Sequence, residues 1–223
     1  MKIISVGCSF TEGTGVGRHN AYIRHLADLC NCEYDNFGEG GHSNKYVFRK
    51  TISLLKNWNK EDILLVQWTG PNREEVVTKE GYIFYSPYNN FMSLEFLFGQ
   101  DVANNPKAHS YTNEKQKEII EKYGKIIDDY TYNLTNNDYS ITSSLCYQIS
   151  TFNMLENLGI KHINFFGWDA VKLNDVYDFT NEKFLDISFG KYTKTPSSEH
   201  PDLEGHVNWA KYLFDKLKNF NYI

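Results

Sequence analysis

The segment that decides the fold of this chain is Lys2-Ile3-Ile4-Ser5-Val6-Gly7-Cys8-Ser9-Phe10-Thr11. Its first five residues are mostly apolar, which predicts a short buried strand, and the strand runs into a tight turn that carries Ser9. Reactive groups collect at the carboxyl ends of strands in open α/β sheets, and a sharp turn there can expose a serine hydroxyl. Ser9 is therefore the leading candidate nucleophile. The alternative is Cys8, which is less favoured because successive residues of an extended chain point in opposite directions.

Strands and helices alternate along much of the chain. The patterns predict helix 21–31, strand 33–37, helix 44–58, strand 62–68, helix 140–158, strand 160–166, a short strand near 184–187 and helix 203–220. In the first of these helices Tyr22, Leu26 and Leu29 fall on one side, and Gly159 is placed to end the third. Units that alternate in this way imply a parallel sheet with right-handed crossovers. The predicted fold is a three-layer α/β/α sandwich around a central five-stranded parallel sheet.

The stretch after the third strand breaks this pattern. Residues 76–78 and 82–85 predict a hairpin, residues 86–110 show no clean period, and residues 114–129 predict a charged helix. Because the stretch follows the carboxyl end of a strand, we interpret residues 73–137 as a lid or substrate-side insertion. The alternative is an embellishment that only packs on the scaffold. In both cases the length fits a single domain, residues 1–223.

Composition restricts the possible classes of function. The formal net charge is −5 and no basic stripe is present, which argues against a nucleic-acid partner. No apolar run approaches the roughly 20 residues that span a bilayer, so no membrane partner is expected. No apolar signal region precedes the first strand, so we expect a cytoplasmic protein, and the high content of Asn, Tyr, Phe and Lys favours a viral or bacterial source. Four cysteines (Cys8, Cys30, Cys32 and Cys146) lack zinc-ligand spacing, which predicts reduced thiols and no metal.

Three further segments carry candidate site residues. Residues 36–44 form a glycine-rich turn that leads into a helix with Ser43 as its predicted N-cap. Glycines allow backbone N–H groups to approach a ligand closely, so this turn could donate hydrogen bonds to an oxyanion. Residues 64–73 form a strand and a turn that presents Asn72, and residues 199–206 lead into the last helix.

Taken together, the four segments resemble the SGNH (GDSL-type) hydrolases, a family with four short blocks in fixed chain order. The matching residues, in order, are Gly7-Cys8-Ser9, Asn36-x-Gly38-x-x-Gly41, Gly70-Pro71-Asn72 and His200-Pro201. The blocks span the chain from end to end. The resemblance implies a flavodoxin-like sandwich and a serine hydrolase that acts on ester bonds.

The resemblance also implies a role for each matched residue. Ser9 would be the nucleophile and His200 the base, while the Ser9 and Gly41 backbone N–H groups and the Asn72 amide would form the oxyanion hole. Asn72 has a second interpretation, as a cap of the following turn. His206, in the first turn of the last helix, competes for the role of base. The proline after His200 keeps that residue extended, which suits a loop side chain that reaches into a cleft.

The acid that orients the histidine is the weakest part of the match. Cys8 and Arg73 stand where the family usually has Asp, and Ser197 stands at the position of the acid, three residues before His200. The residues that could replace the acid are Asp202, Asp169 and Glu199. Our hypothesis is a Ser–His dyad in which a backbone carbonyl near Ser197 orients the ring.

The function predicted from the sequence is hydrolysis of a short-chain acyl ester, an O-acetyl group on a carbohydrate, through an acyl-Ser9 intermediate. No metal or organic cofactor is expected, and the expected partner is a small-molecule or glycan ester. Trp68, Trp168 and Tyr85 are candidates either for sugar contacts or for plain packing. Two alternatives stay open: an O-acyltransferase that acts on a sugar, and a non-catalytic binding or assembly module on the same scaffold. The sequence does not determine the oligomeric state.

Overall fold

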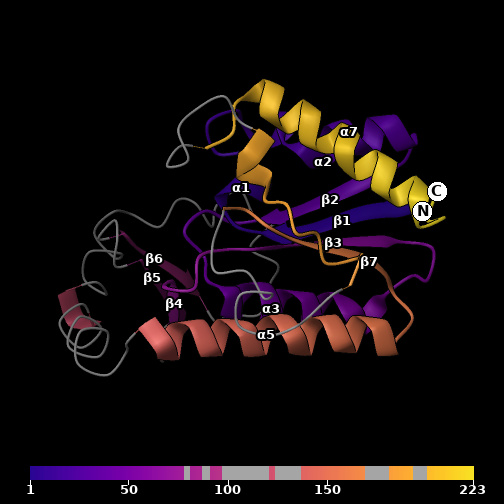
Figure 1. Ribbon diagram of the computed structural model, residues 1–223. Helices are drawn as coiled ribbons and strands as arrows, with labels where there is room; N and C mark the ends of the chain where they lie inside the picture. Colours follow the sequence, from indigo (N-terminus) through magenta and orange to yellow (C-terminus); the bar gives the residue numbers. More distant parts are fainter. Residues whose placement is uncertain (78–80, 87–90, 97–120, 124–136, 169–180, 193–199) are drawn as a thin grey trace.

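The computed structural model describes residues 1–77, 81–86, 91–96, 121–123, 137–168, 181–192 and 200–223 (Figure 1). Within them, a parallel sheet of four strands has the order β2-β1-β3-β7. The strands are β1 (Lys2–Gly7), β2 (Glu33–Gly38), β3 (Ile63–Trp68) and β7 (Lys161–Phe166). The chain adds strands on one side of β1 and then on the other, as in a doubly wound sheet. The predicted α/β class is confirmed.

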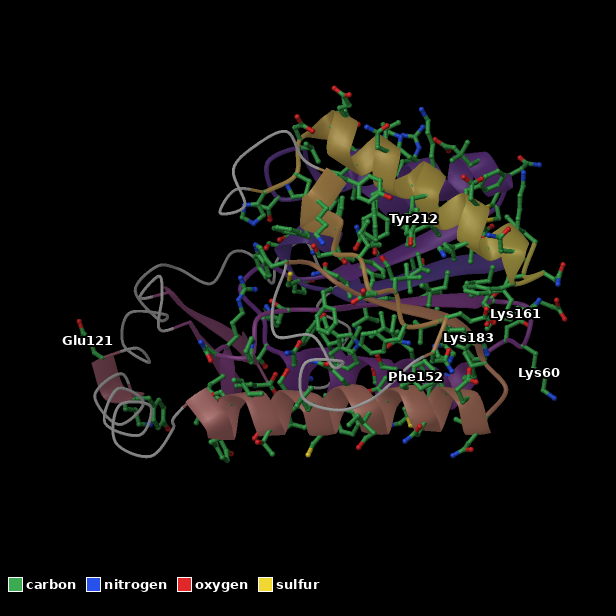
Figure 2. The ribbon with its side chains drawn as sticks, viewed as in Figure 1. Lys60, Glu121, Phe152, Lys161, Lys183 and Tyr212 are labelled. Atoms are coloured by element: carbon green, nitrogen blue, oxygen red, sulfur yellow. The ribbon has the colours of Figure 1, made fainter. Side chains whose placement is uncertain are left out.

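Helices cover both faces of the sheet (Figure 1). On one face α2 (Tyr22–Cys30) packs against α7 (Leu203–Asn219), and on the other α3 (Asn44–Leu54) packs against α5 (Asn137–Asn157). Side chains fill both spaces, with Tyr212 on the α7 side and Phe152 on the α5 side (Figure 2). Because the central strands are buried on both faces, β3 is apolar almost throughout and does not alternate.

Several helix ends differ from the prediction by a few residues. The helix predicted over 44–58 ends at Leu54 and continues as a 3₁₀ turn, η2 (Leu55–Asn57). Ser43 caps it as predicted, because its side chain accepts a hydrogen bond from the backbone N–H of Tyr46. Leu29, predicted on the packed side of α2, is exposed.

Among the helices described, none is both long and apolar enough to cross a bilayer.

The fifth strand is reduced to a single contact in the described residues. Asn164 of β7 and Phe184 form an isolated parallel bridge. A turn precedes Phe184, because its N–H donates to the carbonyl of Asn181, and a 3₁₀ turn, η5 (Phe189–Tyr192), follows soon after. Only residues 185–188 remain between Phe184 and η5, and the chain bends at 186 and 187, so the predicted strand at 184–187 does not form a ladder.

The insertion contains a second, antiparallel sheet of three strands beside the carboxyl end of the central sheet (Figure 1). The predicted hairpin is confirmed as β4 (Glu74–Val77) and β5 (Gly81–Ser86). A third strand, β6 (Phe91–Phe96), pairs with β5 and was not predicted. Of the helix predicted over 114–129, residues 121–123 are helical and the rest lies outside the described residues.

Gly38, at the end of β2, allows the chain after β1 to pass directly over it. A Cβ atom at Gly38 would collide with the backbone nitrogen of Glu12 and would lie 2.8 Å from its Cα. We expect Gly38→Ala to lower the free energy of unfolding by about 1–3 kcal/mol, because backbone atoms cannot move aside as a flexible side chain can. Urea denaturation measures this, with Gly70→Ala as the control, since a Cβ at Gly70 would meet nothing within 4 Å. Equal losses in the two variants would contradict this close approach.

Candidate functional site

The turn that carries Ser9 is fixed by one buried side chain from β3. Ser9 begins a short helix, α1 (Ser9–Glu12), and is itself buried, with 5% of its surface exposed. The Oε1 atom of Gln67 accepts hydrogen bonds from the N–H of Thr11 at 2.9 Å and from its hydroxyl at 2.6 Å. The Nε2 atom of Gln67 donates to the Cys8 Sγ atom at 2.9 Å. The Gln67 amide therefore holds the residues on both sides of Ser9.

The second glycine turn lies against the first. The side-chain amide of Asn36 donates to the carbonyl of Thr11 at 2.8 Å. Arg18, from the loop after α1, donates to the carbonyl oxygens of Asn36 and Gly38 at 3.0 and 2.8 Å. Gly41 has a φ of +79°, a left-handed conformation that favours glycine. Together these bonds hold the Gly40–Gly41 turn next to the Ser9 turn, so that a Cβ at Gly40 would lie 3.8 Å from the Ser9 Cβ.

His42 stabilises this turn from the other side. Its Nδ1–H donates to the carbonyl of Gly40 at 3.0 Å, and its ring contacts that of Tyr46 edge-on at 4.4 Å between centroids. Burial lowers the pKa of His42 to about 4. The imidazole is therefore neutral at physiological pH and acts as a structural hydrogen-bond donor.

The loop that carries Asn72 is tied to the start of α3. The Asn44 side chain accepts a hydrogen bond from the N–H of Thr69 at 2.8 Å and donates to its carbonyl at 3.0 Å. Arg73 donates to the His42 carbonyl at 3.4 Å, and its guanidinium lies over the Trp168 ring at 4.6 Å. These contacts bring the loop that carries Asn72 close to the Gly40–Gly41 turn, at the carboxyl end of the sheet.

His200 lies over the Ser9 loop. Its ring centroid is 5.3 Å from that of Phe10, the residue after Ser9, and its Cβ is 3.8 Å from where a Cβ of Gly15 would be. Burial and the positive charge of Arg73 lower the pKa of His200, while the negative charge of Glu12 opposes them. The ring is therefore neutral near pH 7 and able to accept a proton. The direct pairing of His200 with the Ser9 hydroxyl stays a prediction.

His206, the competing base, lies elsewhere in the core. It is fully buried, and its Nδ1 accepts a hydrogen bond from the backbone N–H of Tyr22 at 3.0 Å while the two rings stack. Burial lowers the pKa of His206 to about 4. This geometry fits the structural role of bracing α7 against α2.

Among the candidate acids, Asp202 has a structural role at the start of the last helix. Asp202 is the N-cap of α7, and its carboxylate accepts a hydrogen bond from the N–H of Gly205 at 2.7 Å. Asp169, Glu199 and Ser197 lie outside the described residues.

Of the aromatic candidates, Trp68 is fully buried and donates to Asn164 at 3.0 Å, so it belongs to the core. Trp168 is partly exposed and lies between Phe10 and Arg73, at the rim of the candidate site. Tyr85 belongs to β5, and its side chain is not among the side chains that the structure describes.

Glu12 is a site residue that the sequence did not reveal. Its Oε2 atom accepts a hydrogen bond from the hydroxyl of Thr14 at 3.0 Å and lies 2.8 Å from where a Cβ of Gly40 would be. The carboxylate is thus beside the Gly40–Gly41 turn, and its charge acts on His200. No local pattern marks Glu12, because its place depends on how the two turns pack. In the described part of the chain, no three His, Cys, Asp or Glu side chains come together as a metal-binding group.

The two charges around His200 predict opposite changes in the pH profile of activity. Arg73→Met removes a positive charge that disfavours the imidazolium, so the pKa of His200 rises and activity is lost at a higher pH as the solution is acidified. Glu12→Gln removes a favourable negative charge, so the pKa falls and the acid limb moves to lower pH. The acid limb of kcat/KM measures both shifts. Arg24→Met is the control, because Arg24 pairs with Asp28 on the surface of α2. Shifts in the same direction for Arg73→Met and Glu12→Gln would refute the assignment of His200 as the base.

Comparison with known proteins identifies the fold. No model of a known protein family matches the sequence, and no curated protein matches it. Among solved structures, an acetyl xylan esterase (Est2A) from the rumen bacterium Butyrivibrio proteoclasticus is similar, with a TM-score of 0.51 and 16% identity. That match covers 100% of this chain, which spans 64% of the esterase.

A lipolytic protein of the G-D-S-L family from Desulfitobacterium hafniense DCB-2 has a TM-score of 0.49 and 12% identity, over 96% of this chain and 98% of the other. At such low identity a structural likeness shows the fold alone. The order of the strands in the parallel sheet agrees with the likeness to the acetyl xylan esterase. The chain therefore has the fold of the SGNH (GDSL-type) hydrolases.

Proposed function

We propose that the protein is a serine esterase that removes a short acyl group, an acetyl group in the first instance, from a carbohydrate. The observation that carries the proposal is the convergence of four separate loops at one end of the sheet. The Ser9 turn lies against the Gly40–Gly41 turn, the Asn72 loop is tied to the same region, and His200 packs on Phe10. A nucleophile, a neutral base and oxyanion donors are the groups that acyl transfer requires.

The proposed reaction has two steps. The Ser9 Oγ attacks the ester carbonyl carbon while His200 takes the hydroxyl proton, which gives a tetrahedral intermediate. Its collapse breaks the bond to the alcohol oxygen, and the imidazolium gives that oxygen its proton. Water then attacks the acyl-Ser9 carbonyl and loses a proton to His200, which returns it to the Ser9 oxygen as the acid leaves. The residues return to their starting state, and side chains and water supply every proton.

The oxyanion of each intermediate would accept hydrogen bonds from the Ser9 and Gly41 N–H groups and from the Asn72 amide. A Cβ atom at Gly40 would lie 3.8 Å from the Ser9 Cβ, and Gly41 follows it in the left-handed conformation. Glu12 pairs with Arg18 at 3.5 Å, and its negative charge would stabilise the imidazolium of His200.

The direct test is release of p-nitrophenol from p-nitrophenyl acetate by the wild-type protein and by Ser9→Ala. Release by the wild type alone supports the esterase, whereas equal rates for the two proteins would favour the non-catalytic module. Adding a free sugar to the assay separates hydrolysis from acyl transfer: free acetate is the product of the first, and an acetylated sugar is the product of the second.

The acetyl xylan esterase neighbour is the reason to name a carbohydrate ester before other esters. That activity belongs to a different protein at 16% identity, so it guides only the choice of test substrate. An acetylated xylan fragment should therefore be included beside p-nitrophenyl acetate in the first assays.

A further inference from the structure

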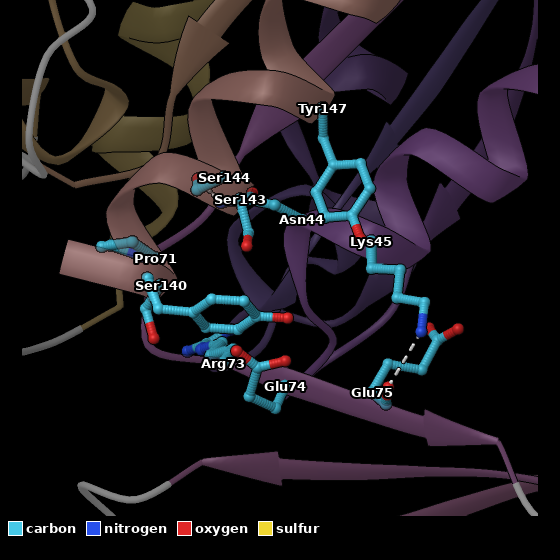
Figure 3. Close-up of a pocket in the computed structure, with 11 residues that line it drawn as sticks. Asn44, Lys45, Pro71, Arg73, Glu74, Glu75, Ser140, Ser143, Ser144 and Tyr147 are labelled. Carbon is cyan, nitrogen blue, oxygen red and sulfur yellow. Dashed lines mark hydrogen bonds between the residues drawn. The ribbon is translucent and has the colours of Figure 1, made fainter. Parts of the chain in front are cut away.

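A small polar hollow lies beside the loop that carries Asn72 (Figure 3). It is enclosed by the start of α3, the segment 71–75 and the first turns of α5, and its volume is about 70 Å³. Two of the residues that line it are close in sequence to the proposed oxyanion donors. Lys45 lies in the first turn of α3, shortly after Gly41, and Arg73 follows Asn72 directly. A substrate carbonyl held between those donors would therefore have the hollow as a neighbour.

The groups around the hollow are both donors and acceptors of hydrogen bonds. The Lys45 ammonium donates to the main-chain oxygen of Glu75 at 3.2 Å, which uses one of its three N–H donors. The Ser144 hydroxyl accepts from both Asn44 and Gln148, so its remaining capacity is to donate. Burial raises the pKa of Tyr147, so its phenol keeps its proton.

Glu74 supplies the acceptor. Its carboxylate is half-buried in the wall of the hollow, where burial raises its pKa and the charge of Lys45 lowers it. The neighbouring carboxylate of Glu75 pairs with Arg49 at 3.2 Å. The lining carries charges of both signs, Glu74 on one side and Lys45 and Arg73 on the other, so it does not select for an anion. The polar lining does not suit an acyl chain either. A neutral group with several hydroxyls can donate hydrogen bonds to the carboxylate and accept hydrogen bonds from the ammonium and hydroxyl groups of the lining.

We propose that this hollow binds hydroxyl groups of the sugar that carries the ester, an inference that rests on the proposed function. A volume of about 70 Å³ has room for a few water-sized groups, so it takes one or two hydroxyl-bearing carbons and not a whole sugar ring. Glu74 accepts from a sugar hydroxyl, and Lys45, Ser143 and Tyr147 donate to its neighbours. The hollow thus selects the alcohol side of the ester, while Ser9 acts on the acyl side.

The test compares two substrates in two variants. For wild type, Glu74→Gln and Ser143→Ala, kcat/KM is measured with 6-O-acetylglucose and with p-nitrophenyl acetate, which has no sugar. We expect the ratio of the two values to fall about tenfold in each variant, because a hydrogen bond to the sugar is lost. Ser150→Ala, on the exposed side of the same helix, is the matched control and keeps the wild-type ratio. A ratio that stays unchanged in Glu74→Gln and Ser143→Ala would overturn the proposal, whether both substrates keep their rates or lose them equally.

A binding experiment separates this inference from the proposed function. Methyl α-D-glucopyranoside is titrated into isotope-labelled wild type and Glu74→Gln, and the binding is followed by NMR. Binding by the wild type that weakens at least fivefold in Glu74→Gln supports the hollow as a sugar site even if p-nitrophenyl acetate is not hydrolysed. Ester hydrolysis with no detectable binding of the glycoside to the wild type leaves the esterase standing and removes the sugar site.

Discussion

Replacing Ser9 with alanine is expected to lower kcat for p-nitrophenyl acetate by a factor of about 10⁴ or more. The proposed reaction has no covalent intermediate without the Ser9 oxygen, and the remaining groups can only assist a direct attack by water. The substitution removes one oxygen atom from a buried side chain, so the fold should survive. Circular dichroism and the unfolding free energy check that the variant is folded before its rate is interpreted.

Cys8→Ser is the matched control for this experiment. Cys8 is the other nucleophilic side chain in the turn, and its sulfur accepts a hydrogen bond from Gln67. A serine at this position keeps an acceptor for that bond, so activity should stay within severalfold of the wild type. If Ser9→Ala kept the wild-type rate while Cys8→Ser lost it, the nucleophile would be the thiol and the proposed mechanism would be wrong.

Asn72→Ala has the second largest expected effect. Loss of one oxyanion donor typically costs about 10²–10³ in kcat, because the bond is made in the transition state and not to the ground-state carbonyl. The value of KM should change little for the same reason. Steady-state kinetics with p-nitrophenyl acetate measure both quantities.

The alternative role of Asn72, as a cap of its own turn, predicts a different result. A cap would affect folding more than chemistry, so the unfolding free energy would fall by about 1 kcal/mol with kcat within a few-fold of the wild type. Asn44→Ala provides the comparison, because Asn44 holds the same loop through both backbone groups of Thr69. It should lower the stability and kcat together, whereas Asn72→Ala should lower kcat alone.

The parts of the fold that follow from local pattern could be predicted from the sequence. Strands β1, β3 and β7 are buried along almost their whole length and each carries consecutive apolar residues, so their positions could be predicted to within one residue. Ser43 and Gly159 signal the start of α3 and the end of α5 through capping chemistry that depends on neighbouring residues only.

The sheet edges were harder to predict. Residues 92–96 alternate between apolar and polar side chains, but the run is short and lies in a stretch rich in Asn and aromatic residues that shows no clean period as a whole. Its pairing with β5 is a contact that composition alone does not reveal. The segment near Phe184 has strand-like composition, but turns on both sides limit it to one bridge.

The site divides in a similar way. The ends of β1, β2 and β3 place Ser9, Gly41 and Asn72 at one end of a parallel sheet, which sequence order and topology could predict. His200 is placed by its packing on Phe10 and not by the end of a strand. Gln67 gave only a partial signal: a polar residue inside the apolar run of β3 implies a buried hydrogen-bond partner but does not identify it. Glu12 gave none, because its position beside the glycine turn depends on packing between segments that lie far apart in the sequence.

Labelling with a fluorophosphonate tests most directly whether His200 activates Ser9. The reagent loses fluoride when it reacts with a serine oxygen, and it reacts only where a base activates that oxygen. If His200 activates Ser9, the wild-type protein gains the mass of one phosphonyl group, peptide mapping places that group on Ser9, and His200→Ala is not labelled. An unlabelled wild type, a label on another residue, or equal labelling of His200→Ala would contradict the claim that Ser9 and His200 act together.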